Sequence, residues 1–237
     1  MTTKDLMVSA HSLNIYIHVA TGAIAMLLGV WIQATAKATS SHRSLGRLFA
    51  GFTLAVCTSA VVGNAVFRFM PLFAVLTVLV LYQLLSGWHV IYTKSNGPNR
   101  IDAFLSVGAV VWGIALVPLV LGSTKRESAP VVIYATLAAL FVLVAYDVLR
   151  WLVPQAWHAA SWRYEHIYKI VASMYAMLSA ASGNLFPQAQ PWSQLVPSGL
   201  GIATIFWFFW RTHREKTMLS RTIVLPLKSL PETSYNS

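Results

Sequence analysis

Charged residues are absent from six long stretches of this 237-residue sequence. The uncharged stretches cover residues 6–36, 48–67, 69–93, 103–124, 128–146 and 170–210. A helix that crosses a lipid bilayer needs about 20 mostly apolar residues, so each of the first five stretches can hold one. The sixth stretch holds two, because three prolines interrupt it and proline disfavours helix at its own position and at the residue before it. The sequence therefore predicts seven transmembrane helices.

The predicted spans are 13–35, 45–67, 71–92, 103–122, 129–151, 167–186 and 195–210. A strand interpretation fails, because the apolar runs are too long and lack sustained alternation. Only 10% of the residues are charged, against about a quarter in an ordinary soluble domain. We therefore expect an all-α polytopic membrane helical bundle over residues 1–212, followed by a basic, partly disordered cytoplasmic tail over 213–237.

Lysine and arginine are distributed unequally between the two sides of this predicted bundle. Thirteen of them, with Arg150, Arg163 and Lys169 counted as loop charges, lie on the side that includes the C-terminus, and four lie on the other side. Cytoplasmic loops carry the excess of positive charge, which predicts an outside N-terminus, a cytoplasmic C-terminus and an inner-membrane location. The basic residues sit in short breaks between apolar runs, a pattern that favours the lipid bilayer as partner and argues against nucleic acid.

Several polar residues fall at or near membrane depth, where each needs a partner or a water-filled cavity. Those predicted near the cytoplasmic side include four of the seven histidines. Asp147, Glu165 and His166 are the candidates for acid–base catalysis. The candidates for cofactor binding are His18, His42, Arg43, Arg47, His89 and His166. A simpler interpretation is that the histidines are packing residues and that Asp147 pairs with Arg150 on its own helix.

A stripe of small residues follows His18 along the first predicted helix. Gly22, Ala25 and Gly29 share its face, and small residues allow a neighbouring helix to approach closely. We therefore expect His18 to face the bundle interior.

Scattered short motifs resemble a bacterial family of multi-pass membrane proteins of unknown function. They are His18-x-x-x-Gly22, His42-Arg43-x-x-Gly46-Arg47, Ser86-Gly87-Trp88, Arg163-Tyr164-Glu165-His166, Gly183-Asn184 and Pro191-Trp192. The resemblance implies no reaction. It does imply that His18, His42, Arg43, Arg47 and His166 form a set worth testing.

Three functions fit these observations. The first is a redox-linked bundle that binds b-type haem or a quinone near the cytoplasmic side, since facing histidines ligate haem iron and arginines suit its propionates. The second is a membrane-embedded enzyme that acts on a lipid or isoprenoid by acid–base or metal chemistry. The third is a small-solute transporter or an accessory subunit of a membrane complex. A lipophilic small molecule or other membrane subunits are the corresponding partners.

Overall fold

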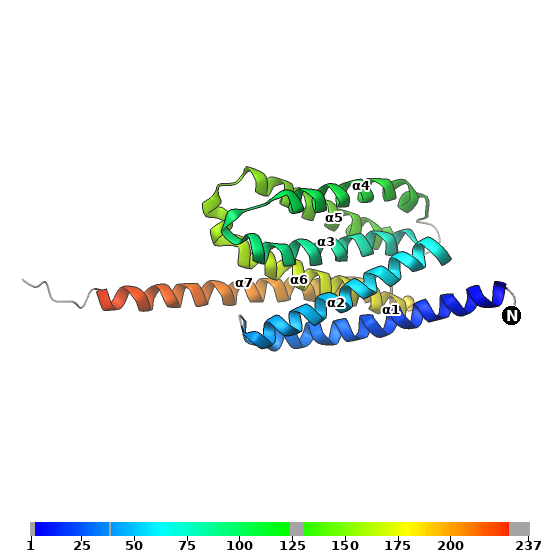
Figure 1. The fold of residues 1–237 in the computed structure, drawn as a ribbon, viewed down its shortest axis with the longest axis horizontal. Coiled ribbons are helices and arrows are strands. Elements are labelled where there is room, and N and C mark those ends of the chain that lie inside the picture. The colour runs from blue at the N-terminus through cyan, green and yellow to red at the C-terminus, as the bar shows by residue number, and fades with distance from the viewer. Residues whose placement is uncertain (1–2, 38, 124–129, 228–237) are drawn as a thin grey trace, which may run out of the picture.

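A computed structural model describes residues 3–37, 39–123 and 130–227, and these residues form seven long helices without a strand (Figure 1). The helices are α1 (Thr3–Ala34), α2 (Ser40–Val62), α3 (Pro71–Thr93), α4 (Arg100–Ser123), α5 (Pro130–Leu149), α6 (Gln155–Leu185) and α7 (Trp192–Leu227). Short helical turns lie between them: η1 (Gly63–Phe67), η2 (Lys94–Asn96), η3 (Arg150–Leu152) and η4 (Pro187–Ala189). The expected all-helical fold is confirmed.

Five of the helical segments are long and apolar enough to cross a membrane. They are Asp5–Ala34, Ser40–Phe67, Pro71–Asn96, Arg100–Val120 and Val131–Leu152. Many large apolar side chains on them are exposed, among them Tyr16, Leu27 and Phe104. Exposed apolar surface on this scale needs lipid rather than water, so the chain has the helices of a membrane protein.

Helix ends coincide with recognisable local signals. Thr39 caps α2 by accepting a hydrogen bond from the backbone N–H of His42 (3.1 Å). Pro71 opens α3, where its missing N–H has no cost. Before α4, Asn99 Oδ1 accepts from the backbone N–H of Ile101, and the Asp102 carboxylate accepts from the backbone N–H of Asn99, each at 2.9 Å.

Successive long helices run antiparallel, and α3 and α6 lie inside the bundle (Figure 1). α3 contacts α2, α4, α5 and α6, whereas α6 contacts α1, α3 and α7. One apolar core lies between α3, α4 and α5, around Leu79, Leu116 and Leu140. A second lies between α1, α2, α3 and α6, around Phe49 and Met174.

The predicted start of the sixth helix is wrong by three turns. The sequence predicts a start at residue 167, but α6 begins at Gln155. Arg163 and Glu165, which the prediction leaves in a loop, are therefore helical. From Ser161 to Gly183, a range described in full, only Arg163 is exposed. A helix enclosed by α1, α3 and α7 does not face lipid, and it can therefore carry polar residues on several sides.

The last helix is also longer than predicted. The sequence predicts a helix over residues 195–210, whereas α7 continues to Leu227 and extends past the ends of the other helices (Figure 1). The first fifteen residues of the predicted tail are thus helical, and residues 228–237 lie outside the described part of the chain.

The small-residue stripe of α1 faces its neighbours, as expected. His18 Nδ1 lies 2.9 Å from Ser59 Oγ on α2, and Ala25 is fully buried. Gly29 makes the tightest contact, because a Cβ there would collide with the side chain of Met174 on α6. A Cβ at Gly22 would meet only Val56, at an ordinary 3.7 Å.

Candidate functional site

Four charged side chains meet in the interior where α5 and α6 pack beside α3. They are Asp147 on α5, Arg150 on η3, and Glu165 and Lys169 on α6. None of the four exposes more than 3% of its surface. Burying one ion is costly unless it is paired, and here two acids are matched by two bases. The group as a whole is therefore neutral.

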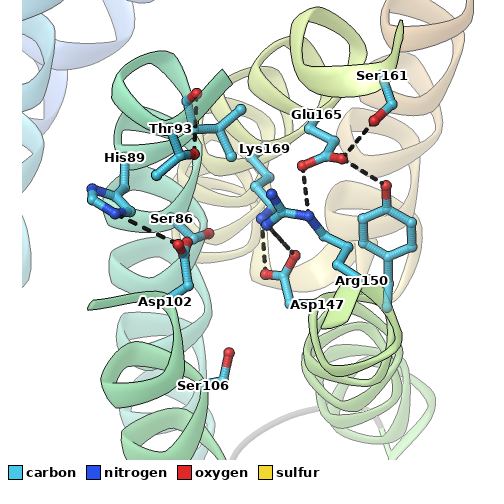
Figure 2. A network of polar contacts seen from close by, with 12 residues as sticks. Ser86, His89, Thr93, Asp102, Ser106, Asp147, Arg150, Ser161, Glu165 and Lys169 are labelled. Atoms are coloured by element: carbon cyan, nitrogen blue, oxygen red, sulfur yellow. Dashed lines mark hydrogen bonds and ion pairs between the residues drawn. The ribbon is translucent and has the colours of Figure 1, made fainter. Parts of the chain in front are cut away.

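The ion pairs cross from one helix to the next. Lys169 Nζ donates to both carboxylate oxygens of Asp147, at 2.7 and 2.8 Å. Arg150 Nε lies 2.9 Å from Glu165 Oε2, and its Nη1 lies 3.4 Å from Asp147 Oδ1. Figure 2 shows the guanidinium between the two carboxylates. Arg150 thus joins both acids into one group.

Neutral hydroxyl groups donate to the same carboxylates. Tyr82 on α3 donates to Asp147 Oδ2 at 2.6 Å, and its oxygen lies 2.9 Å from Ser106 Oγ on α4. Glu165 Oε1 accepts from Tyr146 at 3.1 Å and from Ser161 at 2.9 Å. We call the whole set the charge network: Tyr82, Ser106, Tyr146, Asp147, Arg150, Ser161, Glu165 and Lys169.

Gly87 on α3 allows α6 to come close enough to insert Lys169 into this network. A Cβ at position 87 would lie 2.7 Å from Lys169 Cβ, closer than two such carbon atoms can approach. The same close approach places His166 Nδ1 2.9 Å from the backbone oxygen of Gly87. A glycine here fixes both the position of the buried lysine and the orientation of the adjacent imidazole.

Two of the predicted cofactor-binding histidines, His42 and His166, lie together where the start of α2 approaches α6. His42 and His166 are close enough to interact electrostatically, and both interact with Lys37. Lys37 Nζ stacks over the ring of Phe208 at 4.8 Å. Desolvation by the neighbouring helices lowers the pKa of Lys37, and the positive charge of Arg211 adds to this effect.

The other predicted cofactor-binding residues are elsewhere. His89 points toward the start of α4, where its Nε2 lies 3.0 Å from Asn99 and 3.5 Å from Asp102. His18 belongs to the contact between α1 and α2. Arg43 and Arg47 are exposed on α2. The structure therefore distributes the six predicted residues among several places rather than one.

The sequence predicts functional roles for Asp147 and Glu165, but it places Lys169 among the loop charges and does not connect Tyr82 or Tyr146 to the two acids. One signal was available, because Glu165 and Lys169 are four residues apart and lie on one helix face. The contact between Tyr82 and Asp147 joins residues 65 positions apart. Nothing in the local sequence pattern indicates it.

Among residues 3–37, 39–123 and 130–227, no three His, Cys, Asp or Glu side chains gather closely enough to hold a metal ion. The chain matches no protein-family model, no curated protein and no solved structure. The function must therefore be argued from the site itself.

Proposed function

We propose that all seven helices cross the inner membrane, with the N-terminus outside and the C-terminus in the cytoplasm. Alternating helix direction and the Lys/Arg bias support this orientation. Arg150 and Lys169 no longer count toward the bias, since both are buried, but eleven basic residues against four remain.

Reporter fusions test this topology. A fusion after Arg211 should report the cytoplasm, and a fusion in the turn at 186–195 should report the outside. Both reporters on one side would contradict the seven-pass arrangement.

We propose further that the protein transports a small solute together with protons, and that the charge network is the centre that responds to the proton. The observation that carries this proposal is Asp147, held between Lys169 and Arg150 in the bundle interior. Ionisable side chains inside a membrane bundle are costly and typically mark ion or substrate paths and proton relays. A buried salt bridge adds little net stability, so stability alone is a weak reason for it.

The network is also connected in the way a proton relay requires. Ser106, Tyr82, Asp147 and Lys169 follow one another at hydrogen-bond distance, and so do Tyr146, Glu165 and Ser161. The guanidinium of Arg150 contacts both Asp147 and Glu165 and joins the two groups into one series. Arg150 joins this series to an open pocket at the end of the bundle. A solute that enters there would reach the charged groups directly.

Flux in reconstituted vesicles tests the proposal. The full chain is placed in phospholipid vesicles that contain a pH-sensitive dye, and small organic anions, amino acids, sugars and polyols are added in turn. At least one class should change the internal pH faster than in protein-free vesicles. The Asp147→Asn variant should lose this response, because its neutral amide no longer pairs with Lys169.

Asp102→Asn is the matched control, since Asp102 is also buried but lies outside the charge network. It should keep the response. Failure of every solute class, or an unchanged response in Asp147→Asn, would contradict the transport proposal.

One observation favours the redox function as a second candidate. The bond from His166 Nδ1 to the oxygen of Gly87 makes this nitrogen the donor and leaves Nε2 as a possible ligand, the usual arrangement for a metal-bound histidine. His42, close by, has a buried Nδ1 without a hydrogen-bond partner. A haem-binding protein should show a Soret band that is lost in His166→Ala and kept in His18→Ala. A colourless parent protein would contradict haem binding.

A further inference from the structure

An open pocket of about 360 Å³ lies where η2, η3 and the first turn of α6 meet. Its lining is mostly polar and includes Asn96, Arg150, Gln155 and His158, with Trp151 as the largest apolar side chain. Pockets of this volume suit small molecules. The chemistry of these groups therefore indicates what the pocket accepts.

Arg150 is the only charged group among the lining residues, and it is shared with the charge network. Its Nε contacts Glu165 at 2.9 Å, while Nη1 is at a longer 3.4 Å from Asp147. A guanidinium has five N–H donors arranged to match a carboxylate. An anion in the pocket would thus compete with Glu165 and Asp147 for the same donors.

His158 supplies a polar group that no protein atom satisfies. It is 5% exposed, and its Nδ1 has no hydrogen-bond partner. The ring packs against Gly97, which has a φ of +79°, and a Cβ there would lie 2.8 Å from the ring. Buried polar groups are nearly always paired, so the unpaired nitrogen of this imidazole marks a polar group that a small turn of the ring would offer to a ligand in the pocket.

Other features of this end of the bundle favour negative charge. The pocket adjoins the N-terminus of α6, where no side chain caps the helix and the helix dipole favours an anion. Lys94 lies near by, stacked over Trp162 at 5.7 Å. Both increase the local concentration of anions.

We propose that this pocket binds a small organic anion, a short-chain carboxylate, through Arg150 and His158. The inference names the substrate class of the proposed transport function and rests on that function for its role. Binding adds one negative charge to a neutral network and draws Arg150 away from Glu165. A buried carboxylate without its cation is costly, so Glu165 takes up a proton from solution.

The surroundings of Glu165 are consistent with this exchange. Tyr146 and Asp147 face it from α5, Arg150 faces it from η3, and Tyr168 and Lys169 flank it on α6. Asp102 on α4 acts on Arg150 at longer range. Tyr146 and Ser161 already contact Oε1, which leaves Oε2 as the oxygen that Arg150 would release. Anion and proton would therefore bind together and keep the network neutral.

Calorimetry on the purified full chain tests this with propionate as probe and propionamide as its neutral counterpart. Propionate should bind saturably and propionamide should not. Titrations in two buffers of different ionisation enthalpy should show that about one proton is taken up per propionate. Glu165→Gln should bind propionate without proton uptake.

Two pocket variants and one control complete the test. His158→Ala and Arg150→Lys should each weaken propionate binding by about tenfold or more, as expected for one charge-assisted hydrogen bond. Arg163→Lys makes the same substitution at an exposed arginine outside the pocket, and it should bind like the parent. His158→Ala keeps the ion pairs, so it remains informative if Arg150→Lys does not fold.

Absent propionate binding, or binding that His158→Ala leaves unchanged, would overturn the inference. A vesicle response to sugars alone would leave transport standing and remove the anion site. Propionate binding with proton uptake but without flux would leave the site standing and remove transport.

Discussion

The packed surfaces of α1 and α2 and the side-chain contacts that link α5 and η3 to α6 bury polar groups in opposite ways. In the first, single neutral groups pair across an otherwise apolar surface, as in His18 with Ser59 and Asn14 with the backbone of Ser59. In the second, four ions and their hydroxyl partners fill the interior. Removing one side chain from the first contact leaves a neutral polar group without a hydrogen-bond partner. Removing one from the second leaves a buried charge without its counter-ion. The two contacts should therefore respond very differently to substitution.

The largest effect is expected from Lys169→Met. It leaves Asp147 with the hydroxyl of Tyr82 and, as its one remaining cation, Arg150 at the longer distance of 3.4 Å. An uncompensated buried charge costs about 3–5 kcal/mol. Unfolding in detergent measures the loss. The double variant Lys169→Met with Asp147→Asn should recover part of it, because the unpaired charge is gone. A single variant as stable as the parent would remove the distinction between the two contacts.

A smaller effect is expected from Gly87→Ala. The added methyl group must displace Lys169, and overpacking of this kind costs about 1–3 kcal/mol. Gly22→Ala on α1 is the matched substitution, and it should be neutral or slightly stabilising because its Cβ meets only Val56, at 3.7 Å. Equal unfolding free energies for the two variants would show that α3 and α6 are not held closer than α1 and α2.

The smallest effect is expected from His18→Ala. Interhelical hydrogen bonds in membrane proteins contribute about 0.6 kcal/mol on average, and Ser59 keeps its bond to the backbone of Val56. Thr21→Ala, which removes a bond within α1 only, is the control. A loss above about 2 kcal/mol for His18→Ala would mean that α1 and α2 depend on polar contacts as strongly as α5 and α6 do.

The same comparison explains which parts of the structure could be predicted. α1 to α5 follow from the uncharged stretches, because lipid-facing helices must be apolar along their length. α6 is largely covered by neighbouring helices, so it can carry charges at Glu165 and Lys169 that in the sequence predict a loop, and the prediction omits its first three turns. The ion pair between Asp147 and Arg150 can be predicted, because the two residues are three positions apart along one helical segment. Pairing between helices, such as Asp147 with Lys169, depends on packing that no local pattern encodes.

The ion pairs also bear on how the chain enters the membrane. The segment of α5 and η3 carries an acid and a base three residues apart, Asp147 and Arg150, and α6 carries Glu165 and Lys169 four residues apart. Each segment can therefore pair its own acid with its own base when it passes from the translocon into the membrane by itself. In the folded bundle Lys169 pairs with Asp147 instead, and Arg150 contacts Glu165 as well as Asp147. With these two sets of partners, each of the four buried charges would have an oppositely charged neighbour both before and after the helices come together.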